Sequence, residues 1–228
     1  MTRLVLVRHG ETEWHRENRY AGTSDVALTE RGWDQAHQLA AWSRTAGLAA
    51  IWASTLSRAR LTASLCAETS RVALQVDERL RELDFGDAEG LTSAEMTEQF
   101  PEALDAFRED PVGRHLPGGE HPREAAQRFT ACLHDIAAGH PDGRILVVAH
   151  TTAIRLALCQ ILEVPLREYR RLFPFVRNCS LTEIGLSEGQ FSIMEFNTPL
   201  DRADYRVADA DRRSSVTAPP TLDADVKN

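Results

Sequence analysis

Two short apolar runs, each ending in a histidine, constrain the fold of this 228-residue chain more than any other feature. The first reads LVLVRHG over residues 4–10, and the second reads ILVVAH over residues 145–150. Four or more consecutive apolar residues are typical of strands buried on both faces, as in a parallel sheet. Ligands of such sheets bind beyond the carboxyl ends of the strands. If the two strands are neighbours, His9 and His150 lie in one pocket although they are far apart in the sequence.

The rest of the chain alternates predicted strands with predicted helices. Strands are predicted near residues 3–8, 49–53, 73–76, 144–150, 180–184 and 191–196, the last two as a hairpin. Helices are predicted near residues 29–46, 57–69, 92–109 with an interruption at Pro101, 123–138 and 152–162. This order predicts an α/β fold, a three-layer sandwich with a mainly parallel central sheet flanked by helices. We expect one domain over residues 1–200, followed by a polar, disordered tail over residues 201–228.

Charge and hydropathy narrow the class of partner. The formal net charge is −8 at pH 7, which disfavours binding to the phosphate backbone of nucleic acids. The apolar runs are too short to span a membrane, and the first 20 residues carry many charges in place of the apolar core of a signal peptide. We therefore expect no nucleic-acid partner, no membrane partner and a cytoplasmic location.

The use of lysine and cysteine excludes further classes of chemistry. Lys227 is the only lysine, so a P-loop nucleotide site or a pyridoxal Schiff base is not expected in the folded part. Positive charge in a site must come from arginine or histidine. The four cysteines have no CxxC or CxxH spacing, which predicts buried thiols and neither a disulfide framework nor a zinc site.

Six sequence blocks, in order, resemble the histidine phosphatase superfamily in its phosphoglycerate mutase-like branch. They read LVRHGETEW from residue 6, GTSDVALTERGWDQA from 22, ASTLSRARLTA from 53, LRELDFGDAEG from 80, LPGGE from 116 and VVAH from 147. The resemblance covers residues 3–196. It implies an α/β sandwich, a phosphohistidine intermediate, no metal or other cofactor, and a small phosphorylated metabolite as partner.

By this resemblance, His9 is the residue that becomes phosphorylated, and a neutral imidazole is a competent nucleophile near pH 7. Arg8 and Arg58 match the phosphate-binding arginines of the family, and guanidinium groups bind phosphate oxygens bidentately. His150 is a further donor to the phosphate. On the sequence alone, His9 could instead be a core histidine, Arg58 a solvated helix residue and His150 a helix cap.

The resemblance selects Glu82 as the acid that protonates the leaving oxygen and then deprotonates the attacking water. Asp84, Asp87 and Glu89 are rival carboxylates in the same loop. The remaining histidines show no metal-binding spacing, so no metal site is predicted.

His15, Gly22 and Thr151 are expected to bind substrate together with Arg8 and Arg58. His15 stands where the family usually has asparagine, and Thr151 stands where it usually has glycine. We expect His15 to donate a hydrogen bond to the phosphate, and to strengthen the site when charged at lower pH. Because Thr151 has a side chain where the family usually has glycine, we expect it to hinder close approach of the substrate to the backbone.

Three functions fit these residues. The first is a phosphatase acting on a small phosphomonoester. The second is a phosphoglycerate-type mutase, which must hold a bisphosphorylated intermediate, and the third is a non-catalytic phospholigand-binding protein. The segment over residues 91–120 is rich in acids and has only Arg108 and Arg114 as permanent cations, which favours hydrolysis. The identity of the substrate and the choice between a monomer and a homodimer stay open.

Overall fold

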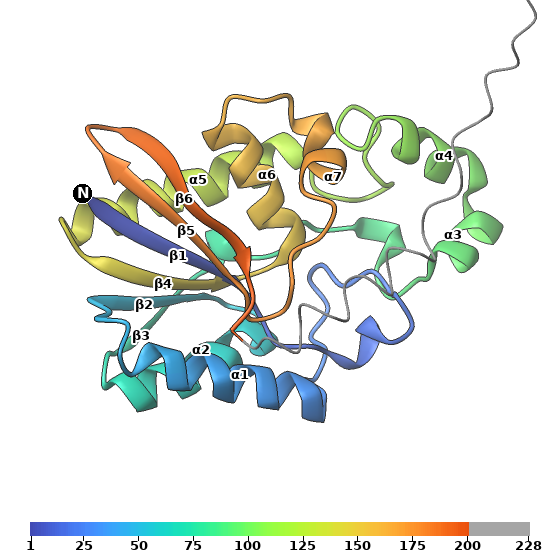
Figure 1. Cartoon of the computed structure of the whole chain (residues 1–228). Helices are drawn as coiled ribbons and strands as arrows, with labels where there is room; N and C mark the ends of the chain where they lie inside the picture. Colours follow the sequence, from blue (N-terminus) through green and yellow to red (C-terminus); the bar gives the residue numbers. More distant parts are fainter. Residues whose placement is uncertain (201–228) are drawn as a thin grey trace, which may run out of the picture.

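A six-stranded sheet lies at the centre of the protein, with its strands in the order β3-β2-β4-β1-β5-β6 (Figure 1). The computed structural model describes residues 1–200, and the predicted tail over residues 201–228 lies outside the described residues. Strands β1 to β4 pair in parallel, whereas β5 is antiparallel to β1 and to β6. The strands are β1 (Thr2–Arg8), β2 (Ala50–Ser54), β3 (Leu74–Asp77), β4 (Arg144–Ala149), β5 (Leu181–Ser187) and β6 (Gln190–Thr198). The mainly parallel sheet and the closing hairpin are both confirmed.

Helices cover both faces of this sheet (Figure 1). Helices α1 and α2 cover one face, α5 and α6 cover the other, and α3, α4 and α7 lie toward the carboxyl ends of the parallel strands. The helices are α1 (Glu30–Ser43), α2 (Ser57–Ser70), α3 (Ser93–Gln99), α4 (Pro101–Glu109), α5 (Pro122–Gly139), α6 (Thr151–Ile161) and α7 (Tyr169–Leu172).

Successive residues of β1 face opposite layers, as the pleat of a strand requires. Leu4 and Leu6 belong to the core that includes residues of α5 and α6. Val5 and Val7 belong to the core formed with α1 and α2. This burial on both faces explains the uninterrupted apolar run in the sequence and confirms the three-layer α/β sandwich.

Most predicted element boundaries agree with the structure. Thr29 caps α1 by accepting a hydrogen bond from the Gly32 amide at 3.0 Å, and Pro101 begins α4 directly after α3 ends. The predicted helix over residues 29–46 ends earlier, at Ser43. The short helix α7 was not predicted, because four residues carry too little periodicity to be recognised.

The four cysteines are buried, as predicted. Within residues 1–200, every helix is too short or too polar to cross a lipid bilayer.

The register between β1 and β4 brings the two strand-end histidines together. Arg8 lies opposite Ala149, and the His9 amide donates to the Ala149 carbonyl at 3.0 Å. His9 and His150 therefore both follow directly after paired strand ends. The sequence-based expectation that these strands are neighbours is confirmed.

Candidate active site

A cavity of about 300 Å³ opens at the carboxyl ends of β1 and β4. Five predicted site residues line it: Arg8, His9, His15, Glu82 and Thr151. Arg58 and His150 do not line this cavity and are completely buried. The His150 ring nevertheless lies against the His9 ring, with centroids 5.1 Å apart.

Hydrogen bonding fixes the tautomer of His9. Its Nδ1 atom lies 2.7 Å from the carbonyl oxygen of Gly10. Because a carbonyl only accepts, Nδ1 carries the hydrogen and Nε2 of the neutral ring holds a lone pair. Burial lowers the pKa of His9 well below its ordinary value, and the nearby His150, Arg58, Arg8 and His15 lower it further. The ring is therefore neutral and nucleophilic at pH 7.

Arg8 is held by the backbone and by a histidine. Its Nη1 atom donates to the Val176 carbonyl at 2.8 Å, and its Nη2 atom donates to Nε2 of His15. Its Nε atom is buried without a partner. Burial lowers the pKa of Arg8 to about 10, so it remains charged at neutral pH.

Arg58, in the first turn of α2, is the largest completely buried side chain. Its guanidinium donates to the carbonyl oxygens of Ala21, Gly22 and Ser24, at distances of 3.2, 2.7 and 2.6 Å. Its Nε atom has no partner. The solvated alternative for Arg58 is therefore wrong. Gly22, predicted to bind substrate, supplies a carbonyl that holds Arg58 and does not line the cavity.

His150 occupies the position before the first residue of α6, but its side chain makes no capping hydrogen bond. Both of its ring nitrogens are buried and have no partner among the residues that the structure describes. Burial lowers its pKa well below the ordinary value, and Arg58, Arg128 and Arg8 add to this shift. The capping alternative is therefore wrong.

Unpaired nitrogens accumulate around His9. No partner is found in the described part of the chain for Nε of Arg8, Nε of Arg58 or either ring nitrogen of His150. A buried donor without a partner typically costs about 1–3 kcal/mol, and such groups are rare in native proteins. Their concentration at one place indicates a site for an external anion with several acceptor atoms.

Glu82 is the carboxylate that faces this site. It is 4% exposed and accepts hydrogen bonds from the amides of Thr152 and Ala153 at 2.9 and 2.8 Å. These amides belong to the first turn of α6, where the helix dipole favours a negative charge. Asp84, Asp87 and Glu89 do not line the cavity, so Glu82 is the only one of these four loop carboxylates that does.

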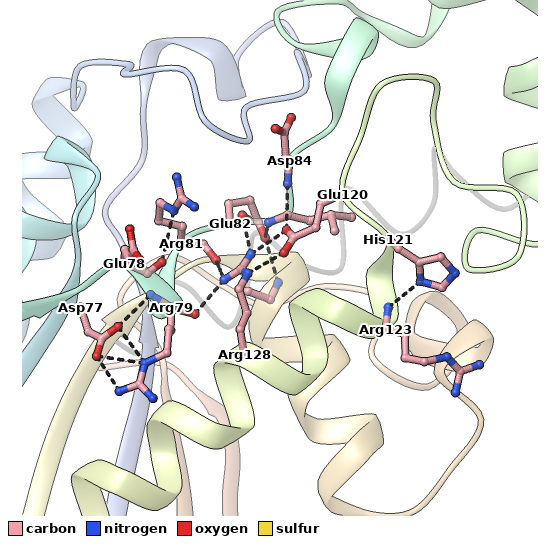
Figure 2. Close-up of polar contacts among 12 residues, drawn as sticks. Asp77, Glu78, Arg79, Arg81, Glu82, Asp84, Glu120, His121, Arg123 and Arg128 are labelled. Atoms are coloured by element: carbon pink, nitrogen blue, oxygen red, sulfur yellow. Dashed lines mark hydrogen bonds and ion pairs between the residues drawn. The ribbon is translucent and has the colours of Figure 1, made fainter.

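The backbone around Glu82 is clamped by Arg128 of α5 (Figure 2). The Arg128 guanidinium donates to the carbonyl oxygens of Arg79, Arg81 and Glu82 at 2.7, 2.8 and 2.9 Å. It also pairs with Glu120 at 2.6 Å. Sequence reasoning missed Arg128, because an arginine on an amphipathic helix looks like a solvated residue.

His15 orients Arg8 in this structure. Its Nε2 atom contacts Nη2 of Arg8, and its Nδ1 atom accepts from the Thr12 amide at 3.0 Å and lies 2.8 Å from the Thr12 hydroxyl. Burial and the neighbouring Arg8 lower the pKa of His15 to about 3. In the free protein this shift keeps His15 neutral at moderately low pH, because protonation would place two cations together.

The cavity contains cations that the sequence analysis did not assign to it. Arg19, Arg155 and Arg170 line it, together with aromatic residues. The segment over residues 91–120 contributes Phe107 to the lining, whereas its Arg108 and Arg114 are exposed and pair with acids of the same segment. The acid-rich segment therefore contributes no charged side chain to the lining of this cavity. A lone arginine in the apolar sequence AIRLALC was the available signal for Arg155.

Among the residues that the structure describes, no group of three or more histidine, cysteine, aspartate or glutamate side chains is placed to hold a metal ion.

A neutral strand-end histidine, unpaired donors and a helix-held carboxylate define a site for chemistry on phosphate esters in an α/β enzyme. Comparison with known proteins gives the same class: residues 4–199 match the model of the histidine phosphatase superfamily (branch 1). The chain belongs to this superfamily and is an enzyme that acts on phosphate esters.

Named relatives include both mutases and phosphatases. A protein named probable phosphoglycerate mutase GpmB from Enterobacter sp. (strain 638) is 38% identical over 191 residues, which cover 82% of this chain and 86% of the relative. The structure of Bacillus stearothermophilus YhfR is 32% identical, with a TM-score of 0.82 over 87% of this chain and 98% of its own. A mycobacterial glucosyl-3-phosphoglycerate phosphatase, solved with VO3, is 30% identical, with a TM-score of 0.78 over 86% of this chain and 98% of its own.

Proposed function

We propose that this protein is a metal-independent phosphatase that hydrolyses a small phosphomonoester through a phosphohistidine intermediate on His9. The observation that carries the proposal is the neutral His9 ring, with its Nε2 lone pair, among the unpaired nitrogens of Arg8, Arg58 and His150. A phosphoryl group supplies the acceptor oxygens that these donors lack.

In the first step, the phosphoryl oxygens bind Arg8, Arg58 and a protonated His150, whose charge the dianion favours. Nε2 of His9 attacks phosphorus, and the bond between phosphorus and the leaving oxygen breaks. Glu82 in its protonated form donates its proton to that oxygen, because an alkoxide is a poor leaving group. The Gly10 carbonyl, which accepts from Nδ1, stabilises the positive charge that develops on the ring.

In the second step, the Glu82 carboxylate removes a proton from a water molecule whose oxygen attacks phosphorus. The bond between Nε2 and phosphorus breaks, inorganic phosphate leaves, and His9 returns to its neutral tautomer. Glu82 holds the proton that the next cycle requires. No step needs a metal, because arginine and histidine supply the positive charge.

A phosphoglycerate-type mutase is the second candidate. The relatives named probable phosphoglycerate mutase favour it, and so do Arg155 and Arg170 in the cavity, since a mutase must hold two phosphoryl groups. The phosphatase proposal is supported by the likeness to a solved phosphatase with 30% identity. Retention of all five predicted catalytic residues disfavours the third candidate, a non-catalytic phospholigand-binding protein.

The test is a panel of phosphomonoesters with and without chelator, followed by a rapid acid-free quench and peptide mapping. We expect release of inorganic phosphate that chelator does not reduce, and a base-stable, acid-labile phosphoryl group on the peptide that contains His9. His9→Ala should abolish both, while His37→Gln, at an exposed position of α1, should change neither. Phosphorylation of another residue, or loss of activity in chelator, contradicts the proposal. Positional isomerisation that outruns phosphate release identifies a mutase.

A further inference from the structure

Arg155 is a buried arginine that the proposed mechanism does not use. It lies on α6 and is 9% exposed. Within residues 1–200, its Nε atom has no partner, and its one backbone contact is long, at 3.4 Å from the Pro174 carbonyl. No carboxylate pairs with it among residues 1–200. A buried cation is costly unless an anion compensates it.

Arg170 of α7 lines the same cavity and is also free of carboxylate partners within residues 1–200. Its polar contact is a long one, at 3.4 Å to the Tyr20 hydroxyl. It lies close enough to Arg155 to lower the pKa of that residue, in addition to the larger effect of burial. The fold thus places two like charges at one cavity, and within residues 1–200 neither forms an ion pair with a carboxylate, although Glu82 lines the same cavity.

Each guanidinium has one face covered by an aromatic ring. Arg155 lies over Tyr169 with 4.9 Å to the ring centroid, and Arg170 lies over Phe107 with 5.1 Å. Stacking occupies a face of the group and leaves its in-plane N–H donors available for a planar or tetrahedral anion. The rings also hold the long side chains in place before a ligand arrives, which lowers the entropy cost of binding.

We infer that Arg155 and Arg170 form a second anion site in the cavity, and that the substrate is a phosphomonoester carrying a further anionic group, either a carboxylate or a second phosphate. This inference rests on the proposed function, because Arg8 and Arg58 bind the reacting phosphoryl group. Aromatic side chains that line the cavity contact the carbon skeleton. The volume of about 300 Å³ suits a small metabolite.

The test compares glycerol 3-phosphate with 3-phosphoglycerate, which differ in that a carboxylate replaces a hydroxymethyl group. A third substrate, 2,3-bisphosphoglycerate, distinguishes a second phosphate from a carboxylate. We expect kcat/KM to be about 10- to 100-fold higher for at least one doubly anionic substrate, as charge-assisted hydrogen bonds provide. Arg170→Gln should lower this preference by at least about 10-fold, and Arg170→Lys should retain part of it.

The control is Arg171→Gln, because Arg171 is the next residue of α7, does not line the cavity and pairs with Glu168. It should leave the preference unchanged. Arg155→Lys provides a second variant that keeps the buried charge but loses the forked geometry. Calorimetric binding of the same three compounds to His9→Ala measures the preference without turnover.

The outcomes separate the two proposals. The first outcome is that p-nitrophenyl phosphate is hydrolysed but kcat/KM is no higher for the doubly anionic compounds, or that Arg170→Gln does not reduce their preference. In that case the second anion site is overturned and the phosphatase proposal stands. If no ester is hydrolysed while calorimetry shows the preference and its loss in Arg170→Gln, the anion site stands and the phosphatase proposal fails.

Discussion

The Nδ1 atom of His9 donates a hydrogen bond to the carbonyl oxygen of Gly10, the next residue in the chain, across 2.7 Å. This short contact forces the ring hydrogen onto Nδ1 and leaves Nε2 as the basic nitrogen. The conformation of the backbone at Gly10 therefore determines which atom of His9 can react.

The first prediction concerns this backbone. A Cβ atom at Gly10 would lie 2.4 Å from the Gly32 carbonyl oxygen of α1, so Gly10→Ala must displace either α1 or the turn after β1. We expect a loss of about 1–3 kcal/mol in the free energy of unfolding, as for other overpacked sites, and a large loss of kcat. Gly139→Ala is the control, because no atom lies within 4 Å of the Cβ that it adds. Urea unfolding and steady-state kinetics measure both; equal behaviour of the two variants contradicts the prediction.

The second prediction concerns pH. Burial and neighbouring cations lower the pKa values of His9, His15 and His150 in the folded protein. Below about pH 6.5, the unfolded chain binds protons that the folded chain does not. The contribution of these histidines to the free energy of unfolding should therefore be fully present above pH 6.5. It should fall as the pH drops below 6.5, by at most about 1.4 kcal/mol per pH unit for each histidine.

The matched variant is His15→Asn, which keeps an acceptor for Arg8 but does not titrate. Urea unfolding between pH 7.5 and 5 should show a smaller slope than in the wild type, by up to the contribution of one histidine. An identical slope in the two proteins would show that His15 ionises normally in the folded state.

Sequence patterns predicted the site where local rules apply and missed it where distant segments meet. His9 and His150 follow apolar strands, so the topology of a parallel sheet was enough to place them together. Arg58 and Glu82 were assigned by resemblance, since a helix arginine and a loop carboxylate have no distinctive local signal. Arg170 could not be found, because α7 is a single turn whose position depends on packing.

The same limit applies to the pKa of His15. An exposed histidine titrates near pH 6.5, and the sequence does not show that residue 15 folds back onto Arg8. This limit also applies to residues 91–120, because the charge of a cavity depends on which side chains line it, and of this segment only Phe107 does. Composition of a covering segment does not contain that information.

The third prediction concerns Arg128, which holds the Glu82 loop from α5 (Figure 2). Arg128→Met should leave three carbonyl oxygens and Glu120 without their donor. We expect a loss of roughly 2–4 kcal/mol in the free energy of unfolding, and a larger fall in kcat than in substrate affinity as Glu82 shifts. Arg123→Gln is the control, because Arg123 is an exposed residue of the same helix. A stable Arg128→Met enzyme with wild-type kcat would show that the loop holds itself in place.

The fourth prediction assigns the proton to Glu82. Glu82→Gln removes the titratable group, so hydrolysis of an alkyl phosphate should slow by roughly 10²- to 10⁴-fold, the usual range for general acid catalysis. A phenol leaves without help, so an aryl phosphate should still form the phosphohistidine at a near-normal rate. Hydrolysis of that intermediate should be slow, because the base that activates water is missing. Stopped-flow measurements should show a burst of phenol followed by a slow steady state.

The structure provides the controls for this prediction. Glu82 accepts one amide hydrogen bond from α6 on each of its oxygens, and glutamine has only one accepting oxygen, so Glu82→Gln should also lose about 1–3 kcal/mol of stability. Kinetics are therefore measured well below the melting temperature of the variant. Asp84→Asn and Glu89→Gln change carboxylates of the same loop that do not line the cavity, and neither should produce the burst. If one of them does while Glu82→Gln behaves like the wild type on both classes of ester, the proton belongs to that carboxylate and the assignment of Glu82 is wrong.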